Sequence, residues 1–477
     1  MFPSCQACFL ALSCLITLSL RAQLHYTLTY TDSSAEKVWV TIEAAMPLRA
    51  PVVLIMPRSV PGNYAITKYD AFIEQPEART VDGSSVAMIK SSDGAPRWQY
   101  SDSNVRVRRI SYVVNLKKMD EQLHAASDKS IVRPGFAGLL NYSLFGWIED
   151  HLRDSVTCTI ASFPSWPIFS TLAPSATPAR GTLELQTADY YTLADAQTYL
   201  GPRFRVKAYA APVPLFVVDY TEGATGYLDD YGWEETRSME ILKNYFGSLP
   251  FQHYTVLFRE TIPGPDDDPG NFGMEHLQSS TFFGDTTRIN TQKADEKELW
   301  KRMPTYLHHM AHAFIPLRCY GDTYRPYVLE IPPVIHNIWF NEGFMWYIVY
   351  DTLKQKDWLN FFKSAAYNGP PAIRNMTLQQ LSETASTQYA EDFRLGMAVF
   401  ARGALMAADI NDYVKQHTGG RASMRTVFRY LYEWSLSNQR PFTMEEFPGL
   451  LKGATGLDVT EIYKKWQEPP GDPAPEK

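Results

Sequence analysis

The residues best able to do chemistry lie in two segments, PTYLHHMAHAF at 304–314 and IPPVIHNIWFNEGFMWYIVYD at 331–351. His308 and His312 are four residues apart, so on a helix whose first turn holds Pro304 they lie one turn apart on the same face. Two imidazoles in this arrangement present nitrogens to a common point, which is half of a tetrahedral Zn²⁺ site. Two ordinary polar surface histidines would show the same spacing.

Glu342 lies in the middle of a segment that is apolar on nearly all sides, which predicts a buried helix over about 335–353. A buried carboxylate has to shift its pKa, pair with a cation or ligate a metal. Glu342 is therefore the candidate third ligand of a His₂Glu site, and the alternative is an ion pair with Arg318 or Arg325. His336 is about 240° around the helix from Glu342, so it cannot share the ligand face.

The composition is that of an ordinary globular chain. Its 477 residues carry 45 Lys+Arg against 52 Asp+Glu, a net charge of −7, and 45% of the residues are hydrophobic. At roughly 100–200 residues per domain this length allows two to four domains. A mildly acidic chain without a Lys/Arg-dense block lacks the charge that nucleic acid requires of a partner, so we expect none.

The hydropathy pattern divides the chain into two parts. From Leu24 to about Val218, short runs such as LHYTLTYT, PVVLIMP and DSVTCTIASF alternate apolar and polar residues, which predicts strands. After Asp219 the period changes to 3.6, with one strand-like run at 254–259. We expect a multidomain α+β chain, with an all-β sandwich-like domain over 23–218, a mainly helical lobe over 219–465 and a flexible tail over 466–477.

The apolar run at 8–20 is about 13 residues long, which is too short to cross a bilayer. We interpret residues 1–22 as a signal peptide and expect an exported protein, periplasmic or secreted, with no stable membrane span in the mature chain. The alternatives are an uncleaved anchor and a mis-assigned start codon.

Two further features remain open. Three of the five cysteines lie in the predicted signal peptide, which leaves Cys158 and Cys319 either to form one bridge or to stay as two buried thiols. The acidic triplet at 266–268 fits a Ca²⁺ site or a solvated turn, and it lacks EF-hand spacing.

The stretch from His308 to Phe344 resembles the zinc-binding segment of the glycyl aminopeptidase family of thermolysin-like metallopeptidases, which are gluzincins. The segment GNFGMEH at 270–276 is similar to that family's Gly-x-Met-Glu-His segment, and MPRSVPGNYAITKYDAFI and TADYYTLADAQTYLGP resemble its N-terminal half. Together these stretches cover most of residues 47–465. Many members also carry a PDZ domain, which we do not expect here.

This resemblance has implications for the fold, the cofactor and the substrate. It implies a thermolysin-like catalytic lobe over 219–465, a Zn²⁺ cofactor on His308, His312 and Glu342, and peptides with a free N-terminus as substrates. It also implies that Glu275 holds the free α-amino group of the peptide and that Gly273 and Met274 line the substrate beside it.

Two positions depart from the family pattern. The His-Glu-x-x-His motif reads His308, His309, Met310, Ala311, His312, so a histidine stands where the general base should be. In the segment FARG, Phe400 stands where the family has a tyrosine whose hydroxyl stabilises the oxyanion. Losing a base costs about 10²–10⁴-fold and losing an oxyanion donor about 10²–10³-fold, so we expect impaired hydrolysis. His309 has three possible roles: replacement base, extra metal ligand or satisfied polar group.

These observations leave three hypotheses for function. The first is an exported zinc aminopeptidase-like protein that recognises peptides with small N-terminal residues and hydrolyses them poorly. The second is an inactive pseudopeptidase that binds a peptide or a partner. The third is a different zinc hydrolase that uses the same ligands.

Overall fold

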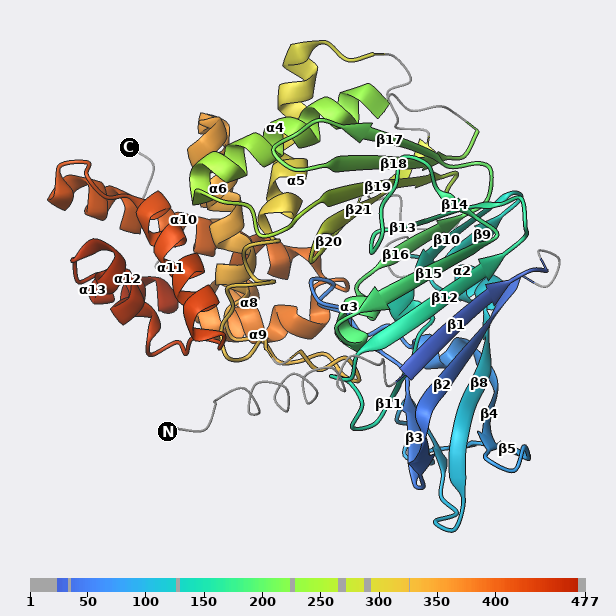
Figure 1. The fold of residues 1–477 in the computed structure, drawn as a ribbon. Coiled ribbons are helices and arrows are strands. Elements are labelled where there is room, and N and C mark those ends of the chain that lie inside the picture. Colours follow the sequence, from blue (N-terminus) through green and yellow to red (C-terminus); the bar gives the residue numbers. More distant parts are fainter. Residues whose placement is uncertain are drawn as a thin grey trace, which may run out of the picture.

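The computed structural model describes residues 24–32, 36–125, 129–223, 228–264, 272–286, 293–325 and 327–470. The predicted signal peptide and the acidic triplet at 266–268 lie outside the described residues. The part that is described is a β-rich N-terminal region followed by a mainly helical C-terminal region, as the hydropathy pattern predicts (Figure 1).

Alternating side chains build the N-terminal region. In β1 (Leu24–Tyr30) and β12 (Val156–Ser162) every second residue is buried, which is the pattern of strands with one face in a core. β1 pairs in parallel with β12 and antiparallel with β2 (Lys37–Arg49). The strands predicted in this part of the chain are confirmed.

Among the described residues, the N-terminal strands form three sheets, ordered β15-β12-β1-β2-β8-β4-β5, β11-β3-β7-β6 and β14-β13-β16-β10-β9. The remaining elements of this region are β3 (Val52–Ile55), η1 (Tyr69–Phe72), β4 (Ile73–Thr80), β5 (Ser85–Ala87), β6 (Ile89–Lys90), β7 (Arg97–Tyr100), β8 (Arg106–Asn115), α2 (Leu116–Gln122), β9 (Ile131–Arg133), β10 (Phe136–Leu140), η3 (Asn141–Ser143), β11 (Trp147–Ile148), β13 (Pro167–Ser170), β14 (Ala179–Arg180), β15 (Thr182–Thr187), α3 (Tyr190–Ala194) and β16 (Gln197–Leu200).

A further sheet lies between the strand-rich and helical regions, and α4 and α5 pack against it (Figure 1). Its order is β17-β18-β19-β21-β20, so β20 is an edge strand next to α5. The strand expected at 254–259 is β19, whereas β17 and part of β18 precede the domain boundary expected at residue 219. The elements are β17 (Arg205–Tyr209), β18 (Leu215–Thr221), α4 (Leu228–Phe246), β19 (Tyr254–Thr261), β20 (Phe272–His276), β21 (Ser279–Asp285) and α5 (Glu296–Ala311).

The C-terminal helices assemble around α10 (Phe393–Thr418), which packs on α6, α7, α9 and η5. Its buried side chains belong to one hydrophobic core that extends into the β-rich region. The other elements are η5 (Trp339–Gly343), α6 (Phe344–Leu353), α7 (Lys356–Tyr367), α8 (Pro371–Arg374), α9 (Leu378–Gln388), α11 (Met424–Asn438), α12 (Phe447–Thr455) and α13 (Thr460–Gln467).

Two helix starts differ from the expectation. α5 begins at Glu296, because Asp295 caps it by accepting a hydrogen bond from the Glu298 amide, so Pro304 lies inside the helix and not in its first turn. The helix expected from 335 begins instead at Trp339 with a π-helical turn, which holds Glu342.

The described residues also answer the open questions about the two cysteines and about membrane-spanning helices. Cys158 and Cys319 are both buried free thiols, and burial raises the pKa of each. The helices of the described part of the chain include none with the length and hydropathy that a bilayer span requires.

Candidate metal centre and its cavity

His308 and His312 face each other at the C-terminal end of α5, with their Nε2 atoms 3.0 Å apart. Their exposed fractions are 4% and 1%, so the interpretation as surface histidines is wrong. Nδ1 of His312 lies 2.9 Å from the Ile315 carbonyl oxygen. A ring that donates from Nδ1 keeps a lone pair on Nε2, which is the form that ligates metals.

Glu342 completes a three-residue cluster from the π-helical turn. Its Oε2 lies 3.3 Å from Nε2 of His308 and 3.3 Å from Nε2 of His312, while the Tyr64 hydroxyl donates to Oε1 at 2.9 Å. Arg318 donates instead to the carbonyl oxygens of Leu277 and Ala313, so the alternative ion pair with Arg318 is not formed. His336 faces Glu383, apart from the cluster.

The separations within this cluster fit a metal ion. Ligand atoms about 2.0–2.1 Å from a tetrahedral Zn²⁺ lie about 3.3 Å from one another, close to the 3.0, 3.3 and 3.3 Å observed. Two nitrogens and one carboxylate oxygen are also the donor set of thermolysin-type catalytic zinc. The buried cluster is therefore compatible with a metal ion.

The charges of the cluster favour a cation. Burial lowers the pKa of His308 to about 3, so its ring is neutral at pH 7. Burial also disfavours the charged form of His312, but the carboxylates of Glu342 and Glu275 outweigh it and raise the pKa of His312 to about 9. Glu342 is buried too, yet His312 and His308 hold its pKa well below the ordinary value. Two carboxylates therefore face one charged histidine, and a metal cation can take the place of the proton on His312.

Strand β20 brings Glu275 to the same place. Gly273 and Glu275 line the cavity beside the cluster, whereas Met274 points into the hydrophobic core, because neighbouring residues of a strand face opposite sides. Burial opposes ionisation of Glu275, but His312 and His309 outweigh it and lower its pKa. Glu275 is buried, and among the described residues its Oε1 has no hydrogen-bond partner.

His309 also lines this cavity, but it is not one of the three converging ligands. Its Nδ1 lies 3.7 Å from Oε2 of Glu275, and its Nε2 edge lies against Gly273, where a Cβ would come within 3.0 Å of that atom. Ligand-type atoms of Glu275, His309 and His312 all lie within 4.8 Å of one another. His309 and Glu275 are thus direct neighbours in the cavity.

Phe400 lines the cavity from α10 because α10 and η5 approach closely. A Cβ on Gly343 would lie within 3.0 Å of Gly403, and one on Gly403 would meet the Trp339 carbonyl. Arg402 donates to the carbonyl oxygens of Met376, Trp466 and Glu468, so it holds the C-terminal segment against α10.

The structure adds two phenols that the sequence analysis did not single out. Tyr64 and Tyr389 both line the cavity, with ring centroids 6.1 Å apart, and the Tyr389 ring lies 5.7 Å from that of Phe400. Tyr64 lies in the stretch MPRSVPGNYAITKYDAFI, which indicates the family resemblance but gives no sign that this tyrosine reaches the site.

Tyr64 reaches the site on a loop of the β-rich region that spans residues 58–64, which we call the inserted loop. The Arg58 and Ser59 amides donate to the Leu329 carbonyl at 2.8 and 3.0 Å, and the Tyr327 hydroxyl donates to the Val60 carbonyl at 2.8 Å. Gly62 has φ +86° and lies against Glu275, where a Cβ would come within 3.0 Å of Oε1. Glycine is therefore required at Gly62 both for its backbone conformation and for space.

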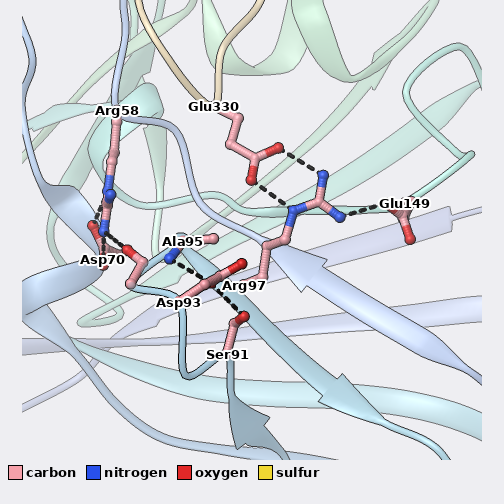
Figure 2. Close-up of polar contacts among 9 residues, drawn as sticks. Arg58, Asp70, Ser91, Asp93, Ala95, Arg97, Glu149 and Glu330 are labelled. Atoms are coloured by element: carbon pink, nitrogen blue, oxygen red, sulfur yellow. Dashed lines mark hydrogen bonds and ion pairs between the residues drawn. The ribbon is translucent and has the colours of Figure 1, made fainter.

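Two separate groups of ion pairs lie near the base of the inserted loop (Figure 2). Arg58 makes a bidentate pair with Asp70 at 2.7 and 2.8 Å. Arg97 of β7 makes a bidentate pair with Glu330 at 2.6 and 2.7 Å and also contacts Glu149 (Figure 2). Because Glu330 follows Leu329 directly, the Arg97–Glu330 pair ties the β-rich region to the segment on which the loop rests.

Comparison with known proteins is informative for the N-terminal part. Residues 25–201 match the family model of the Peptidase M61 N-terminal domain. This match supports the resemblance to the glycyl aminopeptidase family over the three N-terminal sheets, and it ends before the metal-compatible cluster. No curated protein matches the chain.

Solved structures share the fold over nearly the whole chain. A crystal structure of an aminopeptidase N family protein from Idiomarina loihiensis superposes with a TM-score of 0.80 at 16% identity, covering 94% of this chain and 77% of that one. The yeast LTA4 hydrolase in complex with bestatin gives a TM-score of 0.53 at 12% identity, covering 95% of this chain and 69% of that one. At these identities the likeness establishes the fold alone.

Proposed function

We propose that this protein holds one Zn²⁺ on His308, His312 and Glu342 and binds peptides by their free N-terminus, with weak or absent hydrolysis. The observation that carries the proposal is Glu275, a buried carboxylate that lines, together with Glu342, the cavity beside the three converging ligand atoms. Among the described residues, one of its oxygens has no hydrogen-bond partner. A carboxylate in that position favours a ligand that brings its own cationic donor, and a peptide –NH₃⁺ is such a donor.

The residues of the chain have distinct tasks in this account. His308, His312 and Glu342 would hold the Zn²⁺, which would supply Lewis-acid polarisation of a peptide carbonyl. The Glu275 carboxylate accepts hydrogen bonds from the amino group, and Gly62 and Gly273 leave the room that this carboxylate and His309 occupy. Tyr64 fixes the orientation of Glu342 through its 2.9 Å hydrogen bond.

Weak hydrolysis follows from two side chains. A base at position 309 has to take a proton from the attacking water, but Nε2 of His309 lies against Gly273 and its Nδ1 faces Glu275. Position 400 holds a phenyl ring without a donor for the oxyanion. A pseudopeptidase that only captures its ligand is the second candidate, and these same two side chains favour it. We also propose export, which rests on the apolar run at 8–20.

The test compares a free and an N-acetylated form of one peptide by titration calorimetry on the zinc-replete full chain, with mass spectrometry of the same samples for cleavage. We expect the free form to bind at least about 10-fold tighter, because a charged hydrogen bond is worth about 1.5–3 kcal/mol. Glu275→Gln should abolish the difference, whereas Glu298→Gln, on an exposed part of α5, should keep it. Equal affinities in the wild-type protein would remove the amino-terminal recognition.

A further inference from the structure

The cavity beside the metal-compatible cluster has two chemically different ends. Its volume is about 300 Å³. The ionisable side chains of its described lining are Glu275, His309 and Glu342, together with the phenols of Tyr64 and Tyr389. The rest is built by apolar side chains of α6, α7 and α10: Trp346, Trp358, Phe361, Phe362, Phe393, Met397 and Phe400. A ligand that fills both ends carries one polar, charged part and one large apolar part.

The apolar end is continuous with the ligand histidine. The Trp346 ring stacks on His308 with centroids 4.2 Å apart, and Trp358 stacks on Trp346 at 4.8 Å. Phe361 follows at 5.9 Å from Trp358. An aromatic wall therefore runs from the metal-compatible cluster outward along α6 and α7.

Apolar side chains at the mouth of the cavity are exposed to water. Phe361 and Phe393 line it with exposed fractions of 46% and 51%, although large aromatic side chains are costly to expose. They come from different helices, α7 and α10, and both line this cavity. Exposed apolar groups gathered at a concave site are typical of a place where an apolar ligand part is buried.

We propose that the cavity selects peptides whose N-terminal residue has an aromatic or large aliphatic side chain, which lies along the aromatic wall while the amino group reaches Glu275. This inference rests on the proposed function and replaces the expectation of small N-terminal residues. An N-terminal glycine or alanine leaves the aromatic wall exposed to water. Burying a phenyl side chain against the wall gives roughly a 10- to 100-fold gain in affinity.

The experiment is titration calorimetry of the zinc-replete full chain with Phe-Ala-Ala, Ala-Phe-Ala, Ala-Ala-Ala and N-acetyl-Phe-Ala-Ala. We expect Phe-Ala-Ala to bind roughly 10- to 100-fold tighter than Ala-Ala-Ala and tighter than Ala-Phe-Ala. Equal affinities of the three free peptides, or a preference for Ala-Phe-Ala, overturn the inference and leave amino-terminal recognition standing. No binding by any of them, or equal binding of the acetylated peptide, overturns the proposed function itself.

Variants distinguish an effect on the aromatic wall from a general loss of stability. Met397→Trp fills the apolar end and should remove the advantage of Phe-Ala-Ala while Ala-Ala-Ala still binds. Phe361→Ser should reduce that advantage several-fold, and Leu436→Ser, at a position 51% exposed on α11 and outside the cavity lining, should leave it unchanged. An unchanged advantage in Met397→Trp would contradict the inference.

Discussion

Two parts of the chain bring side chains to the metal-compatible cluster and the cavity beside it by different means. α5 and η5 supply His308, His312 and Glu342, and the period of a helix fixes the spacing of the two histidines. The inserted loop supplies Gly62 and Tyr64, and Tyr64 meets Glu342 across a sequence separation of 278 residues. The spacing of the two candidate histidine ligands is thus a local property of the sequence, whereas the approach of Glu342 and of the inserted loop depends on tertiary contacts.

The largest expected effect is on hydrolysis and concerns two residues of the helical region, His309 on α5 and Phe400 on α10. His309→Glu together with Phe400→Tyr should raise hydrolysis of Phe-Ala-Ala by about 10²-fold or more, because a positioned base and an oxyanion donor each contribute at least about that much. Either change alone should recover less, since both act on one intermediate. Liquid chromatography of the cleavage products checks this.

The matched control is His309→Gln with Phe400→Tyr, which has nearly the same shape but no base. A gain of equal size in that variant would show that the carboxylate is not what matters. No gain in the double variant, when it is folded and loaded with zinc, would show that the cavity does not present a peptide bond to the cluster.

The next effect, on metal affinity, tests the contact between the inserted loop and η5. Tyr64→Phe removes the hydroxyl that donates to Glu342, and the loss of such an outer hydrogen bond lowers metal affinity about 10- to 100-fold. Titration against a competing chelator measures it. Tyr112→Phe is the control, because Tyr112 is equally buried and donates at 2.9 Å to the Leu144 carbonyl, far from the cluster along the chain. The same affinity loss in both variants would contradict a specific role for Tyr64.

A third prediction concerns the space between the inserted loop and Glu275. Gly62→Ala places a Cβ within 3.0 Å of Glu275 and should cost about 1–3 kcal/mol of stability, and it should also reduce the preference for a free amino group. Gly83→Ala has a similar φ, +92°, but open space around the Cβ, so only the smaller backbone cost of about 1 kcal/mol is expected. Thermal unfolding with peptide titration compares the two. An equal loss of stability and an equal peptide preference in the two variants would mean that the inserted loop is not in close contact with Glu275.

The smallest effect is on stability and concerns the Arg97–Glu330 ion pair (Figure 2). Arg97 and Glu330 are joined by two hydrogen bonds, but Arg97 is 34% exposed, so solvent weakens their attraction. A double-mutant cycle with Arg97→Ala and Glu330→Ala should give a coupling of about 1 kcal/mol. A coupling of zero would show that backbone hydrogen bonds to Leu329 hold the loop without this ion pair.

The sequence predicts those features that depend on short-range pattern. The alternation in β1 and β12, the change to helical period and the spacing of the two histidines are all visible within a few turns of chain. The start of α5 is missed because Asp295, a good N-cap, lies nine residues before the proline that is taken as the start.

The rest depends on contacts between distant segments. Met274 follows the expected motif, yet strand alternation turns it into the core, and only Gly273 and Glu275 line the cavity. The orientation of His309 depends on its packing against Gly273, and the aromatic wall joins helices whose sequences show no sign of a common cavity. The contacts on which the proposed specificity depends therefore join distant segments, and a single sequence shows such contacts least.

The most direct test of the central claim is the zinc content of the purified chain after metal-replete preparation, measured by elemental analysis. The account predicts about one Zn²⁺ per chain in the wild-type protein, near zero in a His308→Ala, His312→Ala double variant, and an unchanged content in His336→Ala, whose ring faces Glu383. Near-zero zinc in the wild-type protein, or zinc retained unchanged in the double variant, would contradict it.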